Sequence, residues 1–172
     1  MENTAEIKPA KGKDGIKVGA LIGSIAVPVI VGSISAVLTS GAMKQYHAMP
    51  KPPMAPPAYL FPIVWTILYI MMGLAFYYVR TTEADESLKN RAVMYYAIQL
   101  GMNFFWSILF FSLSLYLFSY FWLLGMLLVT VLCTVCFFRI RMISGAMMLP
   151  YILWLSFASY LNCAAYILNK TT

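Results

Sequence analysis

The side chains that could do chemistry lie in three apolar stretches, and they are polar without being charged. In one stretch they recur at i, i+4, i+7, i+8 and i+11, the spacing of one helix face: Gln99, Asn103, Trp106, Ser107 and Phe110. The second face consists of Pro62, Trp65, Tyr69 and Met72. The third face consists of Trp154, Ala158, Leu161, Asn162 and Ala165. Aromatic surface with a few amides and hydroxyls suits a large, flat, mostly apolar ligand. The alternative role of such amides is to bond neighbouring helices to one another.

The same three faces contain no acidic or basic residue, which argues against several classes of chemistry. Ion-coupled transporters and proton pumps usually need an ionisable group inside the membrane, and acid–base hydrolysis needs one at the site. His47 is the single histidine and has no partner at metal-ligand spacing. Cys133 and Cys136 form a CxxC without a second pair, so with Cys163 they are interpreted as small buried apolar residues. We expect no metal and no cofactor.

The composition indicates that these faces lie on membrane-spanning helices. The 172-residue chain is 62% hydrophobic and 10% charged, whereas about 25% of the residues of a soluble domain are charged. Apolar runs of about 20 residues mark membrane spans, and five are expected, at about 17–43, 59–79, 92–113, 116–138 and 147–168. The predicted fold class is an all-α integral membrane bundle of five transmembrane helices, with residues 17–172 as one domain. Residues 1–16 are interpreted as a disordered cytoplasmic tail.

A proline-rich connection separates the first two spans. Six of the nine prolines lie between Pro50 and Pro62. Because proline fixes φ and lacks an N–H group, residues 50–57 cannot form a helix interior. They are predicted to form a stiff lid loop at one membrane surface.

Small residues in the first span predict close helix packing. Gly19 and Gly23 form a GxxxG motif, and Gly32 and Ala36 repeat its spacing. Such faces let helices approach closely. Packing within one chain is favoured over dimerisation through these residues.

Lysine and arginine set the predicted orientation. Nine of them lie in the tail, the second-to-third loop and the fourth-to-fifth loop, and three (Lys44, Lys51 and Lys170) lie on the opposite side. The N-terminus is therefore predicted to be cytoplasmic. Since the net charge of +6 belongs to tails and loops, binding of nucleic acid is not expected.

Helix geometry also predicts how deep the site residues lie. At 1.5 Å per residue, Trp65 lies roughly 9 Å from the non-cytoplasmic surface, and Trp154 about 10 Å from the cytoplasmic one. Asn103 and Ala158 both lie about 16 Å from the cytoplasmic surface. They are predicted to be level, with one tryptophan above and one below.

Three linked motifs on these spans resemble those of the translocator protein (TspO/MBR) family, also called tryptophan-rich sensory proteins. They are KPPMAPPAYLFPIVWTILY followed by MGLA, then QLGMNFFWSILFF, then PYILWLSFASYLN, in matching order over about residues 45–169. The resemblance implies the family's fold, a five-helix membrane bundle with a long first connection over a binding pocket. It also implies a homodimer.

The resemblance further implies ligands and site residues. Members of the family bind porphyrins and related tetrapyrroles such as protoporphyrin IX, and some bind sterols or synthetic isoquinoline or benzodiazepine-type ligands. Carried over motif by motif, the ligand-binding residues would be Tyr46 in the first connection, Trp65, Asn103, Trp106, Ser107, Phe110, Trp154, Ala158 and Leu161. In some bacterial relatives, tryptophans matching Trp65 and Trp154 are tied to light- and oxygen-dependent breakdown of porphyrin.

Two departures from the family bear on the range of ligands. Relatives often have tryptophan where this chain has Met54 and Tyr59, so the lid is less aromatic. Cys163 stands where sterol-binding relatives place a tyrosine. Cholesterol is therefore not expected as the natural ligand.

Three functional hypotheses follow. The leading one is a membrane receptor or carrier for tetrapyrroles, acting in stress or metabolite sensing. The second is a porphyrin-degrading photo-oxidative enzyme with Trp65 and Trp154 as its catalytic residues. The third, a structural membrane partner with an incidental pocket, is disfavoured by the aromatic and amide faces. The same tryptophans would serve stacking and electron donation, so the sequence does not separate the first two hypotheses.

Overall fold

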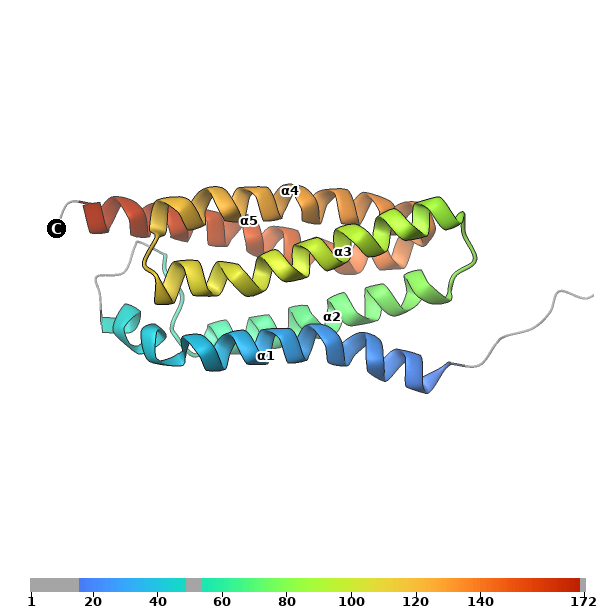
Figure 1. The fold of residues 1–172 in the computed structure, drawn as a ribbon, viewed down its shortest axis with the longest axis horizontal. Helices are drawn as coiled ribbons and strands as arrows, with labels where there is room; N and C mark the ends of the chain where they lie inside the picture. The colour runs from blue at the N-terminus through green and yellow to red at the C-terminus, as the bar shows by residue number, and fades with distance from the viewer. Residues whose placement is uncertain (1–15, 49–53, 171–172) are drawn as a thin grey trace, which may run out of the picture.

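The chain folds into five long helices, seen in a computed structural model that describes residues 16–48 and 54–170, with side chains for 16–43 and 54–169 (Figure 1). The helices are α1 (Val18–Ala48), α2 (Leu60–Thr81), α3 (Glu86–Ser107), α4 (Tyr116–Ile140) and α5 (Met142–Lys170), and a π-helical turn η1 (Ile108–Ser112) extends α3. All five are long and apolar enough to cross a membrane. The prediction of an all-α, multi-pass membrane bundle is confirmed.

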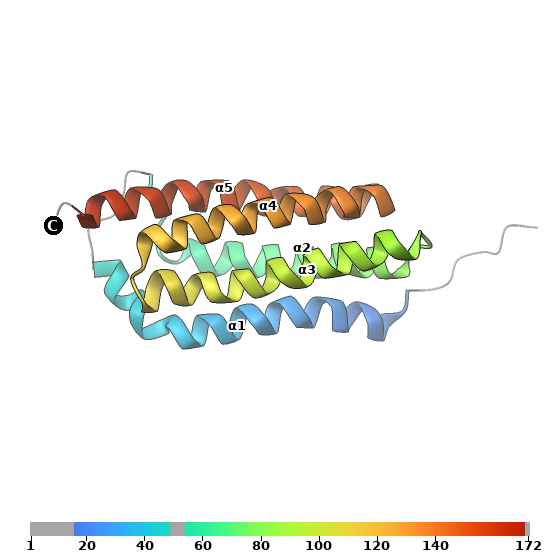
Figure 2. The same cartoon turned by 45° about the horizontal axis from the view of Figure 1, so that its top comes forward.

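The helices form a closed bundle rather than a row in chain order. α1 packs against α2 and α3, α2 packs also against α5, and α4 lies between α3 and α5. Figure 2 shows α4 beside α5 on one side of the bundle and α1 on the opposite side. Faces of α2, α3 and α5 can therefore meet inside the bundle, as the three polar and aromatic stripes require.

α3 and α5 begin well before the apolar segments that predicted them. α3 begins at Glu86 because the Asp85 carboxylate caps it, accepting a hydrogen bond from the Leu88 N–H at 2.9 Å. α5 begins at Met142, five residues before the predicted start, and Arg141 alone separates it from α4. An apolar run marks only the part of a helix that lies in lipid. Polar residues outside the lipid can continue the helix, because its hydrogen bonds then satisfy their backbone N–H and C=O groups.

The predicted lid loop is described only in its second half. Pro50, Pro52 and Pro53 lie outside the described residues, whereas Met54 adopts a left-handed conformation with φ of 64°. The chain then enters α2, and the Leu60 N–H donates to the Pro57 carbonyl at 3.0 Å. The predicted first span ended at residue 43, but α1 continues to Ala48.

Close packing of α1 depends on different glycines from those in the GxxxG motif. A Cβ atom at Gly73 of α2 would lie 2.5 Å from the Ile25 Cα atom, so the α1 and α2 backbones touch there. A Cβ at Gly32 would overlap the ring of Tyr69. Gly19 and Gly23 have no other described atom within 4 Å of such a Cβ. The prediction of close packing within the chain is therefore wrong for Gly19 and Gly23.

α1 is the least buried of the five helices. Among its described side chains, the buried polar ones are the hydroxyl residues Ser24, Ser35 and Thr39, while Ile30 and Val37 point outward. The largest fully buried side chains come from α2, α4 and α5, and Gln99 and Asn103 of α3 follow them. Small side chains on the inner face of α1 leave space between that helix and the rest of the bundle.

Candidate ligand-binding cavity

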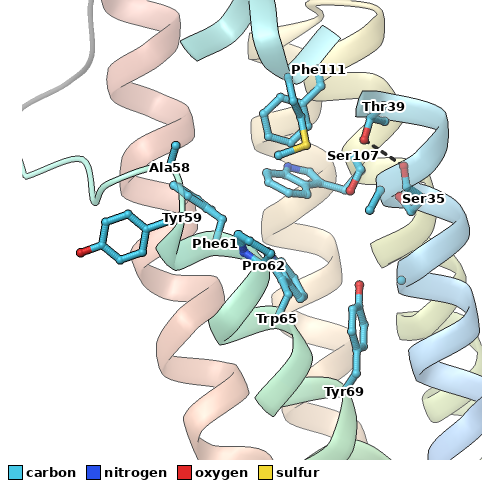
Figure 3. A pocket seen from close by; sticks show the side chains of 14 residues that line it. Ser35, Thr39, Ala58, Tyr59, Phe61, Pro62, Trp65, Tyr69, Ser107 and Phe111 are labelled. Atoms are coloured by element: carbon cyan, nitrogen blue, oxygen red, sulfur yellow. Dashed lines mark hydrogen bonds between the residues drawn. The ribbon is translucent and has the colours of Figure 1, made fainter. Parts of the chain in front are cut away.

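A cavity of about 410 Å³ lies between α1, α2 and α3, next to the residues that lead into α2 (Figure 3). Its lining residues are uncharged: Gly32, Ser35, Ala36, Thr39, Met43, Ala58, Tyr59, Phe61, Pro62, Trp65, Tyr69, Trp106, Ser107 and Phe111. The volume falls within the range of about 300–1,000 Å³ that is usual for ligand pockets. The cavity can therefore hold one polycyclic molecule in a neutral, mostly apolar environment.

The walls of the cavity differ in chemistry. Phe61 and Trp65 of α2 form an aromatic wall, and Ser35 and Thr39 of α1 gather with Ser107 of α3 on the other side (Figure 3). A flat ligand between them would stack on aromatic rings and meet hydroxyl groups at its opposite edge.

The α1 wall follows from a stripe of which the sequence predicted only the small residues Gly32 and Ala36, as a packing face. Gly32, Ser35, Ala36 and Thr39 recur at i, i+3, i+4 and i+7, so small and hydroxyl residues share one helix face. The Ser35 hydroxyl donates to the Phe104 carbonyl at 3.3 Å and ties α1 to α3. The Thr39 hydroxyl donates to the Ser35 carbonyl at 2.9 Å. The same spacing rule that identified the other three faces could have found this one.

Trp65 is the centre of the aromatic side chains at the cavity. Its ring centroid lies 5.4 Å from that of Tyr69, on which it stacks, and 6.2 Å from that of Tyr151. The centroids of Trp106 and Trp154 each lie 6.5 Å away. These contacts hold the indole in place from α2, α3 and α5, so the stacking surface is preorganised.

Asn103 joins three helices and does not line the cavity. Its side-chain oxygen accepts a hydrogen bond from the Tyr69 hydroxyl at 2.7 Å, and its nitrogen donates to the Tyr151 hydroxyl at 3.0 Å. Only 1% of Asn103 is exposed. Its amide therefore bonds neighbouring helices, the alternative role open to it from the sequence, at the base of the cavity.

The predicted site residues separate into groups. Trp65, Trp106 and Ser107 meet at the cavity. Phe110, Ala158 and Leu161 surround a separate void of about 20 Å³, which Trp106 also borders. Trp154 lines a groove of about 390 Å³ on the outer surface between α2 and α5. The side chain of Tyr46 lies outside the described residues; its backbone belongs to α1 rather than to the connection. Ligand binding by these residues stays a prediction.

The π-helical turn adds a residue that the sequence analysis missed. It places the adjacent residues Phe110 and Phe111 against the same indole, with centroids 5.4 Å and 6.0 Å from that of Trp106. Phe111 lines the cavity, whereas Phe110 is buried beside the smaller void. Such turns are frequent at functional sites. No sequence pattern predicts a π-helical turn, so Phe111 could not be identified as a lining residue from the sequence.

The cysteines lie away from the cavity. Cys133 and Cys136 are buried as expected, whereas Cys163 is only half-buried, and all three carry free thiols. Cys133 contacts the Ala92 carbonyl, with 3.9 Å between sulfur and oxygen. Within the part of the chain that the structure describes, histidine, cysteine, aspartate and glutamate form no cluster of three that could hold a metal ion.

Comparison with known proteins agrees with the fold. The sequence model of the TspO/MBR family matches residues 24–168. The chain is 39% identical to the tryptophan-rich protein TspO of Chlorobaculum tepidum over 124 residues, which cover 72% of this chain and 78% of that protein. Identity to the protein of the same name from Archaeoglobus fulgidus is 32% over 87% of this chain and 96% of that one. The translocator protein of Bos taurus is 29% identical over 82% and 85% of the two chains.

Proposed function

The chain belongs to the TspO/MBR family, and we propose that it is an integral membrane receptor or carrier that binds porphyrins and related tetrapyrroles in the cavity between α1, α2 and α3. The observation that carries this proposal is the position of Trp65. Its indole is held by four aromatic neighbours and lines a neutral cavity. A fixed aromatic surface inside an apolar pocket suits a flat macrocycle.

Protoporphyrin IX represents the proposed ligand class, the tetrapyrroles. Synthetic isoquinoline or benzodiazepine-type molecules are proposed as competitors for the same cavity. We propose a role in stress or metabolite sensing, in line with a relative from Cereibacter sphaeroides that is named a tryptophan-rich sensory protein. The N-terminus is proposed to be cytoplasmic, because nine of the twelve basic residues lie on that side. The proposed assembly in the bilayer is a homodimer.

A second candidate function is light- and oxygen-dependent breakdown of the bound porphyrin. It is favoured by the contact between Trp65 and Trp154, whose rings meet edge to face at 6.5 Å. Trp65 lines the cavity, whereas Trp154 lines the outer groove between α2 and α5. Trp154 could therefore replace an electron that Trp65 loses. The light-excited porphyrin with molecular oxygen would be the oxidant.

A titration of the purified protein in lipid nanodiscs tests the proposed function. Tryptophan fluorescence should be quenched saturably by protoporphyrin IX, with one ligand per chain, and an isoquinoline ligand should reverse the quenching. Quenching that rises linearly without saturation, as partition into the bilayer alone would produce, rejects the proposal.

A further inference from the structure

We propose that the outer groove between α2 and α5 binds an acyl chain of an anionic phospholipid, and that Arg141 binds the phosphate of the same lipid. This site goes beyond the proposed function, because it lies outside the cavity that would take the tetrapyrrole. Trp154 lines the groove and Trp65 lines the cavity, so the contact between their rings separates the two sites.

The groove has apolar walls and faces outward. Its volume is about 390 Å³, and α2 lines it from Val64 to Met71, whereas α5 lines it from Pro150 to Phe157. Leu153 on the α5 wall is 71% exposed. Because both helices are long and apolar enough to span a membrane, such a groove opens toward the hydrocarbon of the bilayer. Acyl chains are the molecules that the bilayer supplies there.

The α2 wall of the groove continues toward the end of the bundle where α5 begins. Tyr78 follows Met71 by seven residues, so the two side chains share one helix face. The end of α2 and the start of α5 lie at the same end of the bundle (Figure 1). There the guanidinium carbon of Arg141 lies 4.5 Å from the centroid of the Tyr78 ring. A cation is therefore present where the face that forms the groove meets the membrane surface.

Arg141 is held in position by both neighbouring helices. It is the single residue between α4 and α5, and its backbone is extended, with φ of −156° and ψ of 122°. Its N–H donates to the Phe137 carbonyl at 2.8 Å, and its carbonyl accepts from the Ser144 N–H at 3.0 Å. Stacking on Tyr78 uses one face of the exposed guanidinium and leaves the N–H groups at its edge for a phosphate.

The distance from Arg141 to the groove fits the length of an acyl chain. One leaflet contributes about 15 Å of hydrocarbon, half of a bilayer core of about 30 Å. Along α2, Met71 lies about 10 Å and Leu68 about 15 Å from the level of Tyr78. Tyrosine is common at the level of the headgroups. A lipid whose phosphate is bound by Arg141 can therefore place its chain against Met71 and Leu68.

Charge favours an anionic phospholipid over a zwitterionic one. Phosphatidylglycerol carries a net negative charge, whereas the choline of phosphatidylcholine adds a cation that a guanidinium repels. A basic residue near a membrane surface strengthens the binding of anionic lipid by about fivefold. Arg80 provides a comparison on the same side of the membrane. Its guanidinium carbon lies 5.9 Å from the centroid of the Phe76 ring, which stacks on Tyr96 of α3, so Arg80 lies on the α3 side of α2.

Native mass spectrometry of the full-length protein in detergent tests the phosphate contact. The protein is titrated with dioleoyl phosphatidylglycerol and, separately, with dioleoyl phosphatidylcholine. The wild type should bind the first molecule of phosphatidylglycerol about fivefold more tightly than the first molecule of phosphatidylcholine. Arg141→Gln should abolish this preference, whereas Arg80→Gln should keep it. Equal binding of the two lipids by the wild type, or an unchanged preference in Arg141→Gln, would overturn the inference.

Filling the groove tests the acyl-chain contact. Leu153→Trp adds a large side chain at an exposed lining position, and Leu128→Trp adds the same side chain at an exposed position of α4. Circular dichroism should first confirm that both variants fold. Leu153→Trp should weaken binding of both lipids severalfold, and Leu128→Trp should bind them as the wild type does. Equal effects of the two substitutions would exclude the groove as the site of the chain. A changed oligomeric state in Leu153→Trp alone, with lipid binding unaltered, would also overturn the inference, because a second copy of the chain would then cover the groove.

Discussion

The Tyr69 hydroxyl lies 2.7 Å from the side-chain oxygen of Asn103, and this bond joins α2 to α3 at the base of the cavity. The nitrogen of the same amide donates to Tyr151 of α5. One buried side chain thus fixes three helices relative to one another. Tyr69 also lines the cavity and stacks on Trp65, so the network that holds the bundle also positions the proposed stacking surface.

Replacing Asn103 with leucine should destabilise the bundle. The substitution leaves the Tyr69 and Tyr151 hydroxyls without their shared partner, and hydrogen bonds between membrane helices contribute about 1–2 kcal/mol. Unfolding in mixed micelles, followed by circular dichroism, should show a loss of about this size. Asn169→Leu is the matched control, since Asn169 donates to the Ala165 carbonyl of its own helix. Equal stability of the two variants would contradict a structural role for Asn103.

Gly73→Val should separate α1 from α2. The new side chain would meet the backbone at Ser24 and Ile25, which cannot move aside as a flexible side chain can. Overpacking of this kind costs about 1–3 kcal/mol, and the thermal midpoint should fall accordingly. Gly101→Val is the control, because a Cβ there has no other described atom within 4 Å. A smaller fall for Gly73→Val than for Gly101→Val would show that the backbones do not touch.

The sequence predicts the number and order of the helices but not the relative depth of the site residues. Asn103 and Ala158 were predicted to be level, with a tryptophan above and another below. Instead Asn103 bonds to Tyr69 and Tyr151, and Ala158 borders a void beside Trp106. The rings of Trp65 and Trp154 contact each other. Counting residues along each helix does not set the relative depth of two helices, because the tilt of a helix depends on its packing against its neighbours.

The sequence pattern identifies Trp65, Trp106 and Ser107 of the candidate site but not the hydroxyl residues that α1 contributes. Trp65 stands out because tryptophan is scarce in the chain, and Ser107 because it lies on the same helix face as Gln99 and Asn103. Ser35 and Thr39 belong to a stripe of small residues on α1 that looks like ordinary helix packing. Whether a small residue lets helices touch or leaves a cavity depends on the partner's side chain, as Gly32 shows by accommodating the ring of Tyr69.

Cysteine labelling in intact cells tests the proposed orientation. After the native cysteines are removed, a cysteine at Glu83, between α2 and α3, should react only with membrane-permeant maleimides. One at Met54, which is 79% exposed and lies before α2, should react with impermeant reagents as well. The opposite pattern of labelling would reverse the topology.

Trp65→Phe and Trp154→Phe separate the receptor from the enzyme. If the indoles only stack, phenylalanine keeps most of the ring surface, and binding should weaken by about 1 kcal/mol or less. If they donate electrons, binding should persist in the double variant while light-driven loss of porphyrin stops. Product analysis after aerobic and anaerobic illumination provides the measurement. Degradation at the wild-type rate in the double variant would exclude the enzymatic role of these two residues.

The position of the ligand is tested most directly by filling the cavity. Ser107 lies on its wall, whereas Ser156 is exposed on α5, so Ser107→Phe and Ser156→Phe add the same side chain at a lining and an outer position. Protoporphyrin IX should be titrated against both variants in nanodiscs, after circular dichroism and size-exclusion chromatography confirm the same fold and oligomer. We expect Ser107→Phe to weaken binding at least tenfold and Ser156→Phe to bind as the wild type does. Wild-type affinity in Ser107→Phe would place the ligand outside the cavity between α1, α2 and α3.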